Sequence, residues 1–227
     1  MSAPKSFAAV LFDLDGTLVD TAPDMVATLA ALQEAEGCEP VAFELARTYV
    51  SHGAAGLINL AFPNAGADEH ERLRLAYLDR YEEAVCVHSA LFPGLGALLD
   101  RLDSASLPWG IVTNKPTRMA IPLLASLQIG DRAACTICGD TIPQRKPHPE
   151  PLLLASRQTG VSPARTIYVG DAARDIEAGL AAGMHTIAAA YGYITEDDDF
   201  HTWNAHHIAA DTEELTHLLL KAVNLEA

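Results

Sequence analysis

Phe7-Ala-Ala-Val-Leu-Phe-Asp13-Leu-Asp15-Gly-Thr17 is a short apolar run that ends abruptly in two carboxylates and a glycine. The run is rich enough in Val, Leu and Phe to predict a buried strand. Burying two carboxylates two residues apart costs on the order of several kcal/mol unless a cation or hydrogen-bond donors compensate. Asp13 and Asp15 therefore have no evident role in folding. At the carboxyl end of a strand they are suited to hold Mg²⁺ and to attack a phosphate.

Downstream of Thr17 the apolar residues follow a helical spacing, and from residue 92 onward helical and strand-like segments alternate. The sequence predicts helices at 23–36, 41–50, 54–61, 68–85, 94–102, 117–127, 150–159 and 175–182, with a last helix from about Thr212. It predicts strands at 109–113, 134–138, 166–170 and 186–190. Asp211 and Glu214 have the spacing of a capping box at the start of the last helix.

This alternation predicts an α/β fold with a doubly wound, Rossmann-like parallel sheet. Residues 20–89 contain no convincing strand and interrupt the chain after the first one, so we expect them to form an inserted, all-helical cap domain. Residues 1–19 and 90–227 then form the core domain.

Composition narrows the possible partners and compartment. The formal net charge of −15 argues against a nucleic-acid or anionic-membrane partner, because no basic patch is available. The N-terminal apolar run is too short for a signal peptide or a membrane span. The four cysteines lack the spacing of a disulfide framework, and we interpret the C-x-x-C pair, Cys135 and Cys138, as small buried hydrophobic residues. The protein is expected to be cytoplasmic. The residues leave open whether the chain is a monomer or a homodimer.

Ligands of doubly wound sheets bind beyond the carboxyl ends of the strands, so the residues that follow each predicted strand matter most. Asp13 and Asp15 follow the first strand, and Thr113-Asn114-Lys115 follows the next. Lys146 lies in a later loop, and Gly170-Asp171-Ala-Ala-Arg-Asp175 ends another strand. Carboxylates, a hydroxyl and an amine on one sheet edge are suited to phosphoryl transfer. Lys115 is an alternative to Lys146, which we favour because a proline follows it.

Four short elements in this order resemble the haloacid dehalogenase superfamily, and the resemblance spans the chain. They are D-x-D-G-T at 13–17, T-N at 113–114, K-P at 146–147 and G-D-x-x-x-D at 170–175. The resemblance implies that Asp13 is the nucleophile and Asp15 the general acid and base. It implies that Thr113, Asn114 and Lys146 bind the phosphoryl group.

The same resemblance implies a Mg²⁺ ion held by Asp13, the backbone carbonyl of Asp15, and Asp171. Thr17 and Asp175 would contact the residues that hold the ion. Asp175 would bind the ion through a water molecule or orient Lys146. The chain departs from many relatives at Ala172, where an acid or a hydroxyl is common. The implied activity is that of a phosphatase acting on a small-molecule phosphomonoester.

Sequence features separate reactions within the superfamily. Asp15 argues against dehalogenation, which needs no acid for its leaving group. Residues 20–89 contain no lysine, so a hydrolase that forms a Schiff base with phosphonoacetaldehyde is excluded. The same absence argues against a phosphomutase of the β-phosphoglucomutase type. The phosphomutase remains an alternative. A phospho-acceptor signalling module is an alternative from another class, although such modules lack the second acid and the large insertion.

Two cap and loop segments bear on the substrate. The stretch that follows Arg47, with Ser51 and His52, resembles the specificity loop of phosphoglycolate phosphatases, so these three residues are candidates to face the substrate. Arg72, Arg74 and Arg80 are expected on a solvated helix face. Segments 86–94, 109–116 and 191–194 resemble the phosphatases of N-acetylmuramic acid 6-phosphate. Physical reasoning leaves both substrates open, and the volume of the cap pocket is expected to decide between them.

Overall fold

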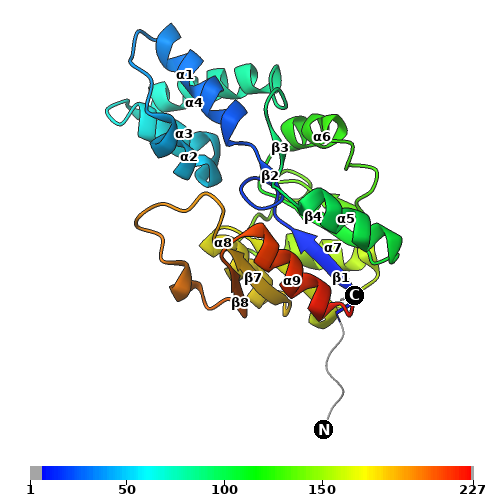
Figure 1. Ribbon diagram of the computed structural model, residues 1–227. Helices are drawn as coiled ribbons and strands as arrows, with labels where there is room; N and C mark the ends of the chain where they lie inside the picture. Colours follow the sequence, from blue (N-terminus) through cyan, green and yellow to red (C-terminus); the bar gives the residue numbers. More distant parts are fainter. Residues whose placement is uncertain (1–6, 226–227) are drawn as a thin grey trace.

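The computed structural model describes residues 7–225, and its centre is a six-stranded, fully parallel sheet (Figure 1). The strands lie in the order β5-β4-β1-β6-β7-β8. They are β1 (Ala9–Phe12), β4 (Trp109–Val112), β5 (Cys135–Ile137), β6 (Thr166–Gly170), β7 (His185–Ala189) and β8 (His207–Ala209). The doubly wound parallel sheet predicted from the sequence is confirmed.

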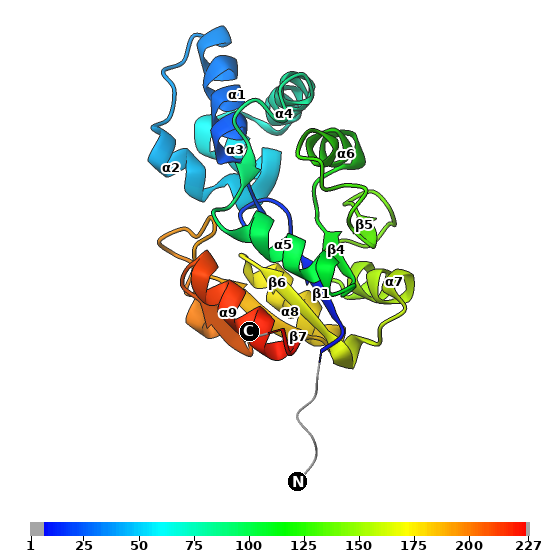
Figure 2. The same cartoon turned by 45° about the vertical axis from the view of Figure 1, so that its right-hand side comes forward.

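Strand β1 lies in the middle of the sheet because its residues are apolar and are buried on both faces. Val10 and Phe12 pack with α5 (Leu95–Ser104), α6 (Thr117–Ser126) and α9 (Thr212–Ala222). Leu11 packs on the opposite face with α7 (Glu150–Thr159) and α8 (Ala173–Ala181). Alternate residues of a strand face opposite sides, so one apolar run serves two helical layers. Figure 2 shows α5 and α9 in front of the sheet.

Four helices lie between β2 (Val19–Asp20) and β3 (Ala90–Leu91), away from the sheet in Figure 1. They are α1 (Ala22–Ala35), α2 (Phe43–Thr48), α3 (Gly53–Ala61) and α4 (Ala67–Glu82). They form a helical cap whose buried side chains continue the hydrophobic cluster of the core. The boundaries at residues 20 and 89 stay a prediction.

The sequence missed three short strands. β2 and β3 pair antiparallel with each other, and β8 extends the edge of the main sheet. Each has two or three residues, so no periodicity can mark it. One half of the predicted capping box is present, since Asp211 Oδ1 accepts from Glu214 N at 2.8 Å; Glu214 Oε2 accepts instead from the N–H of Ala210, the residue before the N-cap, at 2.8 Å.

No helix within residues 7–225 combines the length and apolarity that crossing a membrane requires. All four cysteines are free thiols, and Cys135 and Cys138 are buried, in agreement with their interpretation as small apolar residues.

Candidate active site

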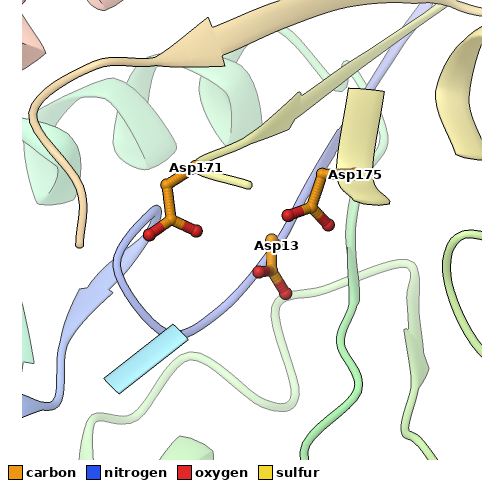
Figure 3. Close-up of side chains that lie close together, drawn as sticks. All are labelled: Asp13, Asp171 and Asp175. Carbon is orange, nitrogen blue, oxygen red and sulfur yellow. The ribbon is translucent and has the colours of Figure 1, made fainter. Parts of the chain in front are cut away.

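Three buried carboxylates meet at the carboxyl edge of the sheet (Figure 3). Asp13 follows β1, Asp171 follows β6, and Asp175 lies in the first turn of α8. Strands β1 and β6 pair in register up to Phe12 and Val169, so their ends bring Asp13 and Asp171 together. Oxygen atoms of the three side chains lie within 4.8 Å of one another, and none of the three residues is more than 3% exposed.

Gly16 gives the chain the turn that this cluster requires. Its φ is +81°, and a Cβ there would lie 2.1 Å from Asp171 Oδ2. Only glycine fits both the backbone conformation and the approach to Asp171. Thr17, one residue later, donates from its hydroxyl to Asp171 Oδ1 at 3.3 Å. Thr17 therefore lies beside the acidic cluster, where the sequence predicts a supporting role for it.

Lys146 is the cation of this cluster. Its Nζ lies 2.7 Å from Asp13 Oδ1 and 2.6 Å from Asp175 Oδ1, and the residue is 3% exposed. Asn114 fixes the loop that carries it, because the Asn114 amide donates to the Lys146 carbonyl at 3.0 Å and accepts from the Lys146 N–H at 3.1 Å. The structure thus brings Lys146, rather than Lys115, to Asp13.

Burial shifts two acids of the cluster, Asp13 and Asp171, toward their protonated forms. Burial, together with the charge of Asp175, raises the pKa of Asp13 to about 6, although Lys146 opposes the shift. Burial and the charges of Asp13 and Asp175 raise the pKa of Asp171 to about 7. Asp175 Oδ2 is buried and accepts no hydrogen bond. Oxygen ligands, excess negative charge and an orphaned oxygen atom fit a hard divalent cation.

The Asp15 side chain points away from the acidic cluster and toward the cap. Its Oδ1 accepts from Thr21 Oγ1 at 2.7 Å and from Lys115 Nζ at 2.9 Å. Lys115 also donates to the hydroxyl of Tyr81, on α4, at 2.9 Å. Asp15 is therefore suited to exchange protons with a substrate that lies between cap and core. Lys115 thus links Asp15 of the core to Tyr81 of the cap, a contact that the sequence did not predict.

A cavity of about 410 Å³ lies between the cap and this edge of the sheet. Asp13, Asp15, Thr113 and Asn114 line its floor on the core side. The cap wall is mostly apolar and includes Met25, Val50, Ala54, Ala55, Tyr77, Leu78 and Tyr81. One cavity therefore joins the predicted catalytic side chains to an apolar surface of the cap.

The three candidate cap residues are placed differently. Ser51 and His52 line the cavity, and Ser51 Oγ donates to Asp171 Oδ2 at 2.6 Å. Arg47 is not among the lining residues. Its Nη1 pairs with Asp20 Oδ1 at 2.8 Å, and its guanidinium stacks on the Tyr193 ring with a centroid distance of 4.9 Å.

The family model for haloacid dehalogenase-like hydrolases matches residues 10–189, which include every motif described above. The chain belongs to this family. The fold and the resemblance predicted from the sequence are thus confirmed.

Two proteins show what this haloacid dehalogenase-like hydrolase is similar to in sequence. A Pseudomonas aeruginosa protein named N-acetylmuramic acid 6-phosphate phosphatase is 43% identical over 216 residues, covering 95% of this chain and 96% of that protein. A Xanthomonas campestris pv. campestris protein named phosphoglycolate phosphatase is 43% identical over 207 residues, covering 91% and 94%. Both relatives are named as phosphatases.

A crystal structure confirms the same arrangement in space. A "predicted phosphoglycolate phosphatase" from Haemophilus somnus superposes with a TM-score of 0.83 at 25% identity, covering 93% of this chain and 97% of that chain. The similarity extends over nearly the whole of both chains, cap and core together.

The sequence did not predict that three arginines, Arg74, Arg145 and Arg174, line the cavity of this hydrolase. Arg174 lines the cavity, and its Nη2 donates to the Ser51 carbonyl at 2.7 Å. Burial opposes its charge, but the cluster of Asp175, Asp13 and Asp171 raises the pKa of Arg174. Arg145 also lines the cavity. Arg174 lies within the motif at 170–175, and Arg145 directly precedes the motif at 146–147. These positions in the sequence could have marked both arginines as site residues.

Proposed function

We propose that the chain is a Mg²⁺-dependent phosphoric monoester hydrolase that works through an aspartyl-phosphate. The observation that supports this most is Asp13, buried at the end of β1, with the Lys146 ammonium 2.7 Å away and two further carboxylates beside it. A carboxylate nucleophile with a cation beside it is suited to attack a phosphate ester.

Asp13 would attack the phosphorus atom, forming an oxygen–phosphorus bond as the ester bond breaks. Asp15 would give its proton to the leaving alcohol. It would then take a proton from the water that hydrolyses the aspartyl-phosphate and releases inorganic phosphate. Thr113 and Lys146 would hold the phosphoryl oxygens, with Asn114 keeping the Lys146 loop in place. The position of Asp15 between the two domains, within reach of a leaving group, supports its role.

The residues fit a Mg²⁺ ion because three buried carboxylates meet there and Lys146 pairs directly with only two of them. Asp13, Asp171 and the backbone carbonyl of Asp15 would hold the ion, which would neutralise charge on the phosphoryl group. Asp175 lies 2.6 Å from Lys146 Nζ, which supports a role in orienting that lysine.

Of the two candidate substrates we propose the bulkier one, N-acetylmuramic acid 6-phosphate. A cavity of about 410 Å³ lies in the size range of pockets for drug-sized ligands, far above the needs of a two-carbon acid such as 2-phosphoglycolate. Its apolar cap wall suits the methyl groups of a substituted sugar. The relative from Pseudomonas aeruginosa, similar over nearly its whole length, supports the same choice.

Ser51 and His52 are proposed to contact this substrate, since both line the cavity. The ion pair of Arg47 with Asp20 supports instead a role in fastening α2 to the first cap connection. The absence of lysine from residues 20–89 continues to argue against a phosphomutase. The hydrolase family and the helical cap argue against a phospho-acceptor signalling module.

We also propose that the enzyme acts in the cytoplasm on a small molecule, as a monomer or homodimer and without nucleic acid or membrane. The net charge of −15 and the free thiols support this.

A panel of phosphomonoesters assayed with Mg²⁺ tests the proposal, with phosphate release as the readout. N-acetylmuramic acid 6-phosphate is expected to give the highest kcat/KM, and EDTA is expected to abolish activity. Ca²⁺ is expected to inhibit, because its looser and higher coordination would occupy Asp13. Full activity in EDTA, or no phosphate release from any ester, would contradict the proposal. A higher kcat/KM for 2-phosphoglycolate would overturn the substrate choice alone.

A further inference from the structure

The cavity gathers positive charge in an otherwise acidic protein. Four of the arginines and lysines line it, in a chain that has 15 basic and 30 acidic residues in all: Arg74, Lys115, Arg145 and Arg174. A cavity that bound only the phosphate would have no need of cations beyond its floor. The four cations differ in their partners.

Two of these cations already have carboxylate partners. Lys115 pairs with Asp15 at 2.9 Å, and Arg74 pairs with Glu71 at 2.7 Å. Arg174 has no carboxylate within ion-pair distance in the described chain, but the charges of the catalytic carboxylates act on it. It therefore belongs to the end of the cavity where the phosphoryl group is expected.

Arg145 differs from the other three. No carboxylate in residues 7–225 forms an ion pair with it, and it is not among the main causes of the pKa shifts of Asp13 and Asp171. Burial acts to raise the pKa of Asp140, but hydrogen bonds from Thr117 outweigh it and lower this pKa. The charge of Arg145 adds a smaller lowering effect. Asp140 is thus near, but its Oδ1 already accepts from Thr117 N and Oγ1.

Arg145 is exposed at the rim of the cavity, and one hydrogen bond to the backbone orients its guanidinium. Its Nε donates to the Gly139 carbonyl at 2.6 Å. Gly139 in turn packs against the loop after β4, since its N–H donates to the Lys115 carbonyl at 2.9 Å and a Cβ there would lie 2.2 Å from the Asn114 carbonyl oxygen. With Nε fixed, the two terminal nitrogens remain for a ligand, and a planar guanidinium matches a carboxylate with two parallel hydrogen bonds.

We propose that Arg145 is a specificity residue that forms an ion pair with a carboxylate of the substrate, so that the enzyme selects phosphomonoesters that are also carboxylic acids. This inference rests on the proposed function and deepens it. N-acetylmuramic acid 6-phosphate carries a carboxylate on its lactyl group, and 2-phosphoglycolate carries one as well. Arg145 would distinguish either from an ester that has the phosphate alone.

Steady-state kinetics on two substrate pairs test the proposal. One pair is N-acetylmuramic acid 6-phosphate and N-acetylglucosamine 6-phosphate, which lacks the lactyl group; the other is 2-phosphoglycolate and ethyl phosphate. Arg145→Met is expected to raise KM for the acids by about 10- to 100-fold, with kcat nearly unchanged, because a charge-assisted contact is lost. For the matched esters without a carboxylate, KM is expected to change by less than about threefold.

Two further variants distinguish this role from a structural one. Arg145→Lys is expected to recover part of the preference for acids, since the ammonium keeps the charge but loses the paired geometry. Arg157→Met, at an exposed arginine of α7, removes the same charge and is expected to change neither pair. If Arg145→Met raised KM equally for the carboxylic acids and for the esters without a carboxylate, or for neither, the inference would be overturned.

An aryl phosphate separates this inference from the proposed function. Wild-type enzyme that hydrolyses the aryl phosphate but shows no preference for acids would refute the role of Arg145 and leave the hydrolase intact. Wild-type enzyme that releases phosphate from no ester would refute both.

Discussion

The two walls of the cavity are built in different ways. On the core wall, Asp13 and Asp171 directly follow paired strands, so the backbone fixes their positions. On the cap wall, residues are held against the core by side-chain contacts, such as Ser51 with Asp171 and Tyr81 with Lys115. This difference suggests a division of work. The core wall should determine the rate of the chemical step, and the cap wall, together with Arg145 at the rim of the core, should determine the affinity for substrate and metal.

The most severe test of this division is Asp13→Asn. The change removes the proposed nucleophile, so kcat is expected to fall by roughly 10⁴-fold or more. Circular dichroism and the melting temperature should show an intact fold, because the amide is isosteric with the acid. Asp131→Asn, at an exposed acid of the core, is the matched control and should keep full activity. Activity of Asp13→Asn within tenfold of wild type would refute the assignment.

Asp15→Asn tests whether the carboxylate that faces the cap still belongs to the chemistry. For an alkyl phosphate, kcat is expected to fall by about 10²- to 10⁴-fold, the usual range for a general acid. For an aryl phosphate, whose leaving group needs little protonation, the first step should suffer much less. Dephosphorylation should remain slow, so stopped-flow records should show a burst of aryl alcohol. Equal losses on both esters without a burst would mean that Asp15 only binds.

Ser51→Ala tests whether a residue of the cap wall affects the affinity for Mg²⁺. The Ser51 hydroxyl helps to counter the rise in the pKa of Asp171 caused mainly by burial, so its loss should make Asp171 a poorer metal ligand. The Mg²⁺ concentration for half-maximal activity is expected to rise about tenfold, as for other residues that support metal ligands. At saturating Mg²⁺, kcat should stay within a few-fold of wild type.

Ser104→Ala removes an exposed hydroxyl of α5 and serves as the control. A Ser51→Ala enzyme with unchanged Mg²⁺ dependence would confine the metal site to the core wall.

The last expected effect is on stability without metal. The pKa values of Asp13 and Asp171 are raised to about 6 and about 7, so the folded protein binds these protons more tightly than the unfolded chain. Their contribution to stability is therefore full below about pH 4 and is lost as the pH rises through 6 and 7.

The melting temperature in EDTA is expected to fall by roughly 10 °C between pH 5 and 8 from this source, since two groups with these pKa values lose roughly 4 kcal/mol over that range and ~1 kcal/mol corresponds to about 2–4 °C in a chain of this size. Mg²⁺ at pH 8 should reverse the loss. Asp171→Asn should flatten the pH dependence, whereas Asp131→Asn should not. An unchanged slope in Asp171→Asn would show that other groups cause it.

The same division explains how much the sequence could predict. The sheet, the helices and the positions of Asp13, Thr113, Lys146 and Asp171 follow from apolar periodicity and from the rule that ligands gather at strand ends. The cap contacts could not be predicted, because a helix brings side chains into a cavity only through its packing. Arg74 illustrates this: its spacing on α4 indicated solvent, yet it lines the cavity.

Two further misses have a related cause. β2 and β3 are too short to show a pattern, and only their pairing makes them strands. Lys146 was favoured over Lys115 because a proline follows it, and that context says nothing about a separate partner for Lys115. The structure provides two lysines because the two carboxylates of D-x-D point in different directions, one toward Lys146 and one toward Lys115.

The short ribbon of β2 and β3 has a consequence for how such enzymes can diversify. Val19 pairs with Leu91 and Asp20 with Ala90, so the chain leaves the core and returns to it at neighbouring points. The ends of the inserted segment are already held together, and a replacement of different length would need no new closure of the core. A foreign cap could therefore be grafted between these two strands while Asp13, Lys146 and Asp171 stay where the sheet puts them. Substrate range can then change by exchange of a whole module, with no change to the catalytic strands.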